Sequence, residues 1–330
     1  MTSYLFIVNP LARGGKNRNA SKRISGYLES LDQGVDYSVL VSERVGHVIE
    51  LARENKDAYD VIVSAGGDGT VNEVVNGIGP HDSTKIGILP LGTGNDTCRS
   101  KGSFTSLEKA LDIILNGSPA ITPAGKVTGE GFIPEMSTVD GENARYCVNN
   151  FLTLFAAVVG YASLTEAKWI KFGFKFTYLA IKKAFAWKNI PATVILDDQV
   201  LKFDNLVLAC AGLGENVGAG MKMFPNTIPF NLRGFPVLIG SEVGNFTILR
   251  LLGSIRSGKH IEHKNVDFYT GIKHIEVETE KPMICDVDSV YPTYTPVSID
   301  FIPDAFQFIV DPSFKESELE RKKILGLAHS

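Results

Sequence analysis

Hydrophobic residues in the first part of the chain fall into short runs that alternate with stretches of helical periodicity. The apolar runs lie at residues 4–8, 37–41, 61–63 and 85–89. Runs of this length, rich in β-branched residues, are typical of strands that are buried on both faces. Between them, apolar positions recur every three or four residues, as in Val71, Val74, Val75 and Ile78, which is one face of a helix. The alternation predicts a doubly wound α/β domain over residues 1–120.

The pattern changes after residue 120, where short segments of alternating apolar and polar residues are separated by turn signals. Such segments are typical of antiparallel sheets, so residues 121–312 are predicted to form a β-sandwich domain. One stretch, residues 161–190, is an exception and is predicted to be helical. Residues 313–330 are rich in Glu, Arg and Lys and are expected to form an exposed C-terminal tail.

Length and composition narrow the class of protein. A chain of 330 residues is long enough for two domains with separate cores. Its formal net charge of −4 argues against a general nucleic-acid binder. The 4 cysteines show no Cys-x-x-Cys spacing, so neither a zinc site nor a disulfide framework is indicated. A reducing compartment fits this cysteine usage best.

Membrane-spanning and targeting segments are not expected. The N-terminus enters the first predicted strand without the basic and apolar regions of a signal peptide. The longest nearly apolar run, residues 151–162, is shorter than the ~20 residues that a spanning helix needs. We therefore expect a cytoplasmic protein that is at most peripheral at the inner face of the membrane. The sequence is silent on oligomeric state.

Two glycine-rich polar turns follow two of the predicted strands. Their sequences are GGDGTVNE at residues 66–73 and PLGTGND at residues 90–96. Glycine permits positive φ and close approach of a ligand to the backbone, and a helix N-terminus attracts anions. Thr70 and Glu73 have the spacing of a capping box, which predicts that Thr70 begins the helix. The turns therefore indicate a phosphate site, with an ordinary capped βα turn as the alternative.

Together with Asn9-Pro10 after the first strand, these turns resemble the diacylglycerol kinase-like lipid kinases, a superfamily that includes sphingosine, ceramide and bacterial lipid kinases. The resemblance covers nearly the whole chain and is strongest in the N-terminal domain. It implies a kinase that uses ATP and Mg²⁺ to phosphorylate a lipid hydroxyl, such as that of diacylglycerol, at a membrane surface. More distant relatives, the NAD kinases and phosphofructokinases, share only the first turn.

The resemblance also implies which residues form the nucleotide site. Asp68 is expected to orient a magnesium-bound phosphate, or else to brace its turn, and is a catalytic candidate. Asn72 and Glu73 are expected to support the turn. The loop that contains Arg13, Lys16 and Arg18 would lie beside the phosphates. The full set of predicted nucleotide-binding residues is Asn9, Ser42, Gly66, Gly67, Asp68, Gly69, Thr70, Asn72, Gly92, Thr93 and Asn95.

The family's catalytic base lies in an Asp-Gly-Glu motif near the C-terminus. The Asp-Gly-Glu triplet at residues 140–142 lies too early in the chain and is interpreted as a hairpin turn. A family proline six residues before the catalytic Asp matches Pro282, which makes Asp288 the candidate base and Asp286 the alternative. Ser289-Val290 stands in place of Gly-Glu, which weakens the transfer of this role.

A second departure concerns the metal. Arg233-Gly234 stands where the family has an Asp-Gly pair that helps to hold magnesium, and an Arg side chain cannot ligate a cation. The metal-ligating residues therefore stay unassigned. Two other functions remain open: a nucleotide-binding regulatory homologue with degenerate catalysis, and a kinase of a soluble metabolite such as NAD.

Lysines and aromatic residues interleave between residues 168 and 188, and acidic residues do not interrupt them. One interpretation is a helix packed by its aromatic residues with solvated lysines outside. The other is an interfacial segment attracted to anionic lipid, in which each lysine near the surface contributes about 1 kcal/mol. The sequence alone favours the packed helix. Because a lipid kinase must meet a membrane, the interfacial interpretation gains weight, and peripheral membrane contact by this segment stays open.

Overall fold

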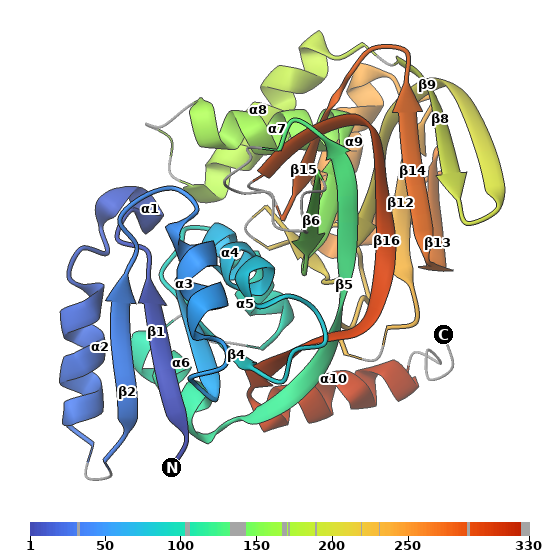
Figure 1. Ribbon diagram of the computed structural model, residues 1–330. Coiled ribbons are helices and arrows are strands. Elements are labelled where there is room, and N and C mark those ends of the chain that lie inside the picture. The colour runs from blue at the N-terminus through green and yellow to red at the C-terminus, as the bar shows by residue number, and fades with distance from the viewer. Residues whose placement is uncertain are drawn as a thin grey trace.

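The computed structural model describes residues 1–324, apart from 32–33, 103–105, 133–142, 167–169, 171, 189, 219, 231 and 289–290. Figure 1 shows an N-terminal part in blue and cyan beside a C-terminal part built mainly of long strands. The Asp-Gly-Glu triplet at 140–142 and the Ser289-Val290 pair lie outside the described residues.

The N-terminal part is a parallel sheet with helices on both faces, as predicted. Its strand order is β4-β3-β1-β2. The strands are β1 (Ser3–Val8), β2 (Asp36–Val41), β3 (Val61–Gly66) and β4 (Lys85–Pro90). The helices are α1 (Ala12–Gly15), α2 (Ala20–Glu29), α3 (His47–Asn55), α4 (Asp68–Ile78), α5 (Asp96–Ser100) and α6 (Leu107–Asn116).

Side chains alternate between the two faces of this sheet and build two cores. Leu5 and Ile7 of β1 pack with α3 and α4 on one face. Phe6 and Val8 of the same strand pack with α2 and α6 on the other. Because both faces are covered, the strands consist of continuous apolar runs.

The C-terminal part is an antiparallel β-sandwich, which confirms the predicted fold class. Its central path runs β13-β12-β9-β7-β15-β16, with β14, β8, β5 and β6 branching from it. The long strands are β5 (Ser118–Glu130), β8 (Ile190–Leu196), β9 (Gln199–Gly212), β12 (Phe235–Ser241), β13 (Val266–Ile272), β14 (His274–Thr279) and β16 (Tyr291–Val310). The short ones are β6 (Ala144–Cys147), β7 (Asn150–Thr153), β10 (Asn216–Val217), β11 (Met221–Lys222) and β15 (Ile284–Val287).

Strands β5 and β16 connect the two parts. They pair with each other along most of their length, and the end of β16 also pairs with β4 in parallel, Phe308 opposite Ile86. Figure 1 shows both strands running from the sandwich into the N-terminal sheet. The sheet is therefore continuous, and the boundary expected at residue 120 falls inside β5.

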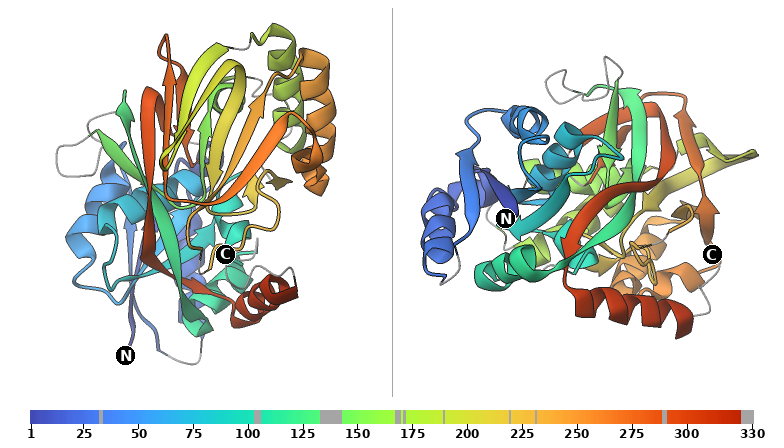
Figure 2. Two further views of the ribbon diagram at one scale, coloured as in Figure 1. Left: turned by 90° about the vertical axis from the view of Figure 1, so that its right-hand side faces the viewer. Right: turned by 60° about the horizontal axis from the view of Figure 1, so that its bottom comes forward.

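Three helices cover one face of the sandwich, α7 (Leu154–Thr165), α8 (Phe172–Ala186) and α9 (Asn245–Ser254). Figure 2 shows α8 and α9 side by side at the edge of the molecule, and α7 packs against α8. Within the described part of the chain, no helix is long and apolar enough to cross a membrane.

The C-terminal tail forms the helix α10 (Pro312–Ile324), which is held on one side rather than fully exposed. Phe314 packs edge-on against Phe230, and a Cβ at Gly102 would lie 2.1 Å from the Phe314 ring. Arg321 donates to Glu215 at 3.0 Å. The tail therefore braces the loop between β9 and β12.

Candidate active site

The two glycine-rich turns pack directly against each other. A Cβ on Gly92 would lie 2.3 Å from Gly67 Cα, and one on Gly67 would lie 3.1 Å from Gly92 Cα. Glycine permits a positive φ, but neither these two glycines nor Gly66 and Gly69 have one. Glycine is needed here because two backbones and the Thr70 side chain, 2.1 Å from a Cβ built on Gly66, leave no room for a side chain.

Helix α4 begins at Asp68, not at Thr70 as the capping-box spacing predicted. The N-cap residue is Gly67, which has no side chain to cap the helix. The Thr70 hydroxyl instead accepts a hydrogen bond from Asn9 Nδ2 at 3.2 Å, which ties the end of β1 to the first turn of α4. The helix N-terminus is thereby presented at the carboxyl end of the sheet, the arrangement that binds phosphate.

The side chain of Asn95 closes the second glycine-rich turn. Asn95 has a φ of 52° and accepts a hydrogen bond from the Gly92 N–H at 3.0 Å. Thr93 is exposed at the tip, while Ser42 is buried and bonds through its N–H to Val8. Asn17 donates to the Leu91 carbonyl at 2.6 Å and so fastens the basic loop beside this turn. Composition alone did not single out Asn17.

Two carboxylates lie at the turns. Thr97 N–H donates to Asp68 at 2.9 Å, and Gly220 N–H donates to Asp96 at 2.9 Å. Burial raises the pKa of Asp68 to about 7, and the charges of Asp96 and, more weakly, Asp288 add to the rise. Carboxylates that raise one another's pKa in this way attract a cation.

Within the described residues, protein side chains alone do not form a complete metal site. Groups of three or more His, Cys, Asp or Glu side chains able to hold a metal do not occur among the described residues. Asp68 and Asp96 nevertheless suit Mg²⁺, which usually takes one or two carboxylates and fills its other positions with phosphate oxygens and water. Arg233 is exposed beside Leu232, Lys273 and Asp304.

Asp288 lies at the end of β15 in a cradle of hydrogen-bond donors. Its Oδ1 accepts from the N–H groups of Asn149 and Asn150 at 2.9 and 3.0 Å. Its Oδ2 accepts from Val148 N–H at 3.0 Å and from Asn72 Nδ2 at 2.7 Å. The side chain is 1% exposed. Burial raises the pKa of Asp288, and these four bonds oppose the rise because they favour the ionised form.

The structure separates Asp288 from the alternative, Asp286. Regular strand alternation would place both side chains on one face, because they are two residues apart. A φ of 53° at Asp288 breaks this pattern. Asp286 lies instead against α7, where a Cβ on Gly160 would be 2.8 Å from its Oδ2.

Asn72 lies inside the protein rather than at the phosphate turn. It is fully buried on α4, donates to Asp288 and to the Tyr146 carbonyl, and accepts a 2.6 Å bond from Arg145 Nε. These hydrogen bonds join α4 to β6 and to Asp288, the candidate base. Arg145, also fully buried, and the 148–150 cradle were not anticipated, because their roles depend on contacts between distant segments.

The parts of this site match two known domain models. Residues 3–127 match the diacylglycerol kinase catalytic domain, and residues 156–310 match the YegS C-terminal NAD kinase beta sandwich-like domain. The chain belongs to the diacylglycerol kinase-like family. It is accordingly a kinase, and the two matched stretches correspond to the N-terminal and C-terminal parts of the fold described above.

Relatives of similar length support the family assignment. The diacylglycerol kinase of Staphylococcus carnosus is 26% identical over 87% of this chain and 88% of its own. That of Staphylococcus saprophyticus is 29% identical over 78% of this chain and 79% of its own. A diacylglycerol kinase structure from Bacillus anthracis shares the fold, with a TM-score of 0.68 at 22% identity, and the match covers 94% of this chain and 97% of that one.

A more distant likeness shows the fold alone. The structure of yeast NADH kinase has a TM-score of 0.54 at 11% identity, and the match covers 100% of this chain and 89% of that one. The diacylglycerol kinase-like family and the NAD kinases therefore share the arrangement of an α/β domain beside a β-sandwich.

Proposed function

We propose that this member of the diacylglycerol kinase-like family transfers the γ-phosphate of ATP to the hydroxyl of a lipid such as diacylglycerol, with Mg²⁺ bound alongside the nucleotide. The observation that supports a lipid substrate is a pair of apolar cavities beneath α7, α8 and α9. A kinase of a soluble metabolite would have little use for such cavities.

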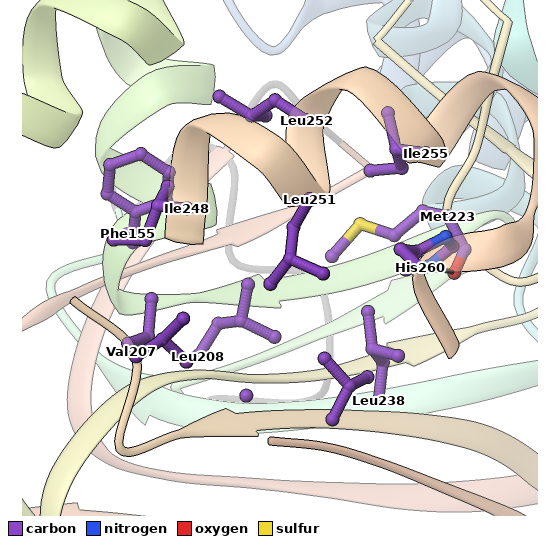
Figure 3. Close-up of a pocket in the computed structure, with 13 residues that line it drawn as sticks. Phe155, Val207, Leu208, Met223, Leu238, Ile248, Leu251, Leu252, Ile255 and His260 are labelled. Carbon is purple, nitrogen blue, oxygen red and sulfur yellow. Dashed lines mark hydrogen bonds between the residues drawn. The ribbon is translucent and has the colours of Figure 1, made fainter. Parts of the chain in front are cut away.

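The two cavities share walls. One, of about 80 Å³, lies between α9 and the sheet and is shown in Figure 3, where Leu208, Leu251 and Met223 point into it. The other, of about 90 Å³, lies between α7 and α8. Both are lined by Phe155, Leu208, Met223, Leu252 and Ile255. Their linings are almost entirely carbon, which is the environment that acyl chains prefer.

The lining of the second cavity adjoins Asp286 and the loop that contacts Asp96. Leu152 and Gly160 line it, and Asp286 is paired with the first and touches the second. Its lining also includes Val217 and Gly218, in the loop that donates from Gly220 to Asp96. A lipid whose chains occupy the cavities would therefore place its polar end near Asp68, Asp96 and Asp288.

The chemistry follows from this placement. The uncapped N-terminus of α4 and the two glycine turns would hold the phosphates of ATP. Asp68 and Asp96 would hold Mg²⁺, which supplies charge neutralisation during phosphoryl transfer. Asp288 would accept the proton of the lipid hydroxyl as its oxygen attacks phosphorus. The donors around Asp288 keep its carboxylate oriented toward the junction of the two domains.

Contact with the membrane is part of the same proposal. Exposed apolar side chains gather on α7 and α8, namely Tyr161, Leu164, Tyr178, Ile181 and Phe185. These side chains lie on the outer surface of α7 and α8, whose inner surfaces line the second cavity. A lipid would therefore enter the cavity from the outer surface of these two helices. Lys182 and Lys183 both pair with Glu166, and Lys175 is buried, which leaves less free positive charge than the sequence predicted. Apolar insertion would therefore contribute more than charge.

A transfer assay tests the function. Radiolabelled ATP and Mg²⁺ would be offered with a panel of lipid hydroxyls in mixed micelles, and separately with NAD. We expect label in a lipid product. Label only in NADP would support the soluble-metabolite alternative, and tight ATP binding without transfer would support the regulatory one.

The cavity can be tested with matched variants. Ala156→Leu fills part of the second cavity from α7, whereas Ala186→Leu adds the same atoms at an exposed position of α8. We expect the first to raise KM for long-chain lipids and to leave ATP affinity unchanged, and the second to change neither. Equal kinetics in both variants would remove the cavities from the proposal.

Membrane contact has its own test. The pair Ile181→Ser and Phe185→Ser should weaken co-sedimentation with vesicles, while Val200→Ser, at an exposed position of the β8–β9 hairpin, should not. If the wild-type protein does not co-sediment with anionic vesicles at low salt, peripheral contact through these helices is wrong.

A further inference from the structure

The C-terminal helix α10 contacts two segments of the chain that meet at Asp96. In its first turn, Phe314 lies against Gly102, which follows α5 by two residues, and a Cβ on Gly102 would be 2.1 Å from the Phe314 ring. Later in the helix, Arg321 Nη2 donates to Glu215 Oε1 at 3.0 Å. Glu215 belongs to the loop between β9 and β12, so α10 holds both this loop and the end of α5.

The loop between β9 and β12 contacts the surroundings of both proposed carboxylates. Its Gly220 N–H donates to Asp96 Oδ1 at 2.9 Å. Its Asn216 carbonyl accepts from Asn149 Nδ2 at 3.1 Å, and the Asn149 N–H donates to Asp288 at 2.9 Å. The position of this loop therefore sets the orientation of Asp96 directly and adjoins the cradle of Asp288.

Glu215 is the residue through which the loop is held. Its Oε1 also accepts from the Asn226 N–H at 3.1 Å, and its Oε2 pairs with Lys222 Nζ at 3.2 Å. Burial opposes ionisation of this carboxyl, but the hydrogen bonds from Arg321 and Asn226 outweigh it, so the pKa of Glu215 lies below its usual value. Lys222 and Asn226 belong to the loop itself. Of these three partners, Arg321 is the one that joins Glu215 to another element.

The geometry of a magnesium site makes this connection important. Mg²⁺ requires nearly octahedral coordination at about 2.0–2.1 Å, so a carboxylate ligand must be held in a narrow range of positions. Asp96 begins α5, a helix of 5 residues, and is 4% exposed. Because so short a helix has few bonds of its own, the orientation of Asp96 depends on the loop and on the packing of α10 against Gly102.

We propose that Arg321 is a positioning residue of the metal site, whose ion pair with Glu215 holds the β9–β12 loop so that Gly220 orients the Asp96 carboxylate for Mg²⁺. This rests on the proposed function, in which Asp68 and Asp96 hold the magnesium ion that accompanies ATP. Arg321 acts through Glu215 and the loop, and the C-terminal helix is therefore needed for full affinity toward the metal.

The variant Arg321→Met keeps the apolar stem of the side chain and removes its charge and its hydrogen bonds. We expect the Mg²⁺ concentration for half-maximal transfer to rise about three- to fivefold, a limit set by the modest strength of a partly exposed ion pair. The kcat at saturating Mg²⁺ should stay unchanged, because excess metal compensates for weaker binding. An unchanged Mg²⁺ dependence would overturn the proposal.

Lys315→Met is the matched control. Lys315 also lies on α10, and its Nζ donates to the Pro119 carbonyl at 3.4 Å rather than to the loop. The variant loses the same charge, and we expect it to keep the Mg²⁺ dependence of the wild type. An equal shift in Lys315→Met would mean that net charge or general loosening of α10 is responsible, which contradicts a specific role of Arg321.

A double-mutant cycle tests the pair itself. Glu215→Gln removes the charge of the other partner and should raise the Mg²⁺ requirement in the same direction. The double variant Arg321→Met/Glu215→Gln should show no larger shift than the more affected single variant, because either substitution already breaks the ion pair. Additive shifts would show that the two residues act independently, and the proposed route through Glu215 would be wrong.

Hydrogen exchange gives a measurement that does not depend on activity. In protein without nucleotide or metal, peptides that contain Gly220 should exchange about three- to fivefold faster in Arg321→Met, and at the wild-type rate in Lys315→Met. If wild type transfers no phosphate to lipid but this difference is seen, the proposed function fails and the hold of Arg321 on the loop stands. Equal exchange in Arg321→Met and wild type overturns the inference whatever the activity.

Discussion

Asn72 Nδ2 donates a 2.7 Å hydrogen bond to Asp288 Oδ2 and so joins residues 216 positions apart in the chain, across the junction of the two domains. Asn72 belongs to α4, the helix whose N-terminus adjoins the glycine turns. Asp288 follows directly after β15 in the sandwich. The bond therefore fixes the candidate base relative to the expected position of the phosphates, which a reaction governed by positioning requires.

Replacing Asn72 should uncouple the two domains. Asn72→Ala removes one hydrogen bond each from Asp288, Arg145 Nε and the Tyr146 carbonyl. Asp288 keeps its three backbone donors and the Tyr146 carbonyl keeps Asn76, so the main cost is the lost bond to the charged carboxylate, about 1.5–3 kcal/mol. We expect a clear loss of Tm and a fall in kcat larger than the change in KM for ATP. Asn76→Ala is the matched control, because Asn76 bonds to Tyr146 but not to Asp288. It should lower Tm with a much smaller loss of kcat. Equal losses of kcat would mean that stability alone is responsible.

The contact between the glycine turns predicts a severe effect from one methyl group. Gly92→Ala places a Cβ 2.3 Å from Gly67 Cα, so the turns must separate. We expect ATP affinity, measured by calorimetry, to fall at least about tenfold, or about 1.4 kcal/mol. Gly26→Ala adds the same atom on α2, where nothing lies within 4 Å. That variant should bind ATP normally and gain about 0.5–1 kcal/mol of stability. Normal ATP binding by Gly92→Ala would place the nucleotide elsewhere.

Much of the fold was predictable because it depends on local pattern. The β-branched run at 61–63 forms the first half of β3, and the helical face of Val71, Val74, Val75 and Ile78 lies on α4 as predicted. The start of α4 was predicted wrongly, since the Thr70 hydroxyl is taken by Asn9. The capping-box spacing carries no information about Asn9, which lies 61 residues before Thr70 and occupies its hydroxyl.

The site was predictable only in part, for the same reason. The glycine turns and Asp288 were found because their sequences resemble a family. Arg145 and the 148–150 cradle have no local signature, and their positions around Asn72 and Asp288 arise from the packing of α4, β6 and β15. The cavities were equally hidden, since Leu208 or Met223 in a sequence is indistinguishable from core.

His260 gives the sandwich a pH-dependent stability. It is 4% exposed, lines the first cavity, and its Nε2 lies 3.0 Å from the Met223 carbonyl. Burial lowers the pKa of His260 in the folded state below its ordinary 6.5. As pH falls through about 6.5 the unfolded state binds more protons than the folded state, so stability is present above that pH and is lost below it.

The measurement is Tm between pH 7.5 and 5.5. We expect Tm to fall on acidification in wild type and the slope to become shallower in His260→Gln, whose amide N–H can still donate to Met223. An identical slope in the variant would show that protonation of other groups controls acid stability.

The two aspartates of β15 and its final turn provide the last prediction. Asp288 is held by four donors at the domain junction, whereas Asp286 faces Gly160 of α7. Asp288→Asn removes the proton acceptor, and general-base assistance is typically worth about 100- to 10,000-fold in rate. We therefore expect transfer to lipid to collapse while ATP binding persists, and Asp286→Asn to cost much less.

The thermal stability of each variant must be measured in this comparison, because the groups that surround the Asp288 carboxylate are hydrogen-bond donors. An Asn at position 288 turns an N–H₂ group toward N–H groups of the 148–150 segment or Asn72, which costs about 1–3 kcal/mol. Rates should thus be measured well below the Tm of the weaker variant, with ATP affinity as the test of an intact N-terminal domain. A larger loss in Asp286→Asn would make Asp286 the base. Small losses in both would mean that no carboxylate here accepts the proton, and the regulatory alternative would then explain the departures at Ser289-Val290 and Arg233 better than a kinase does.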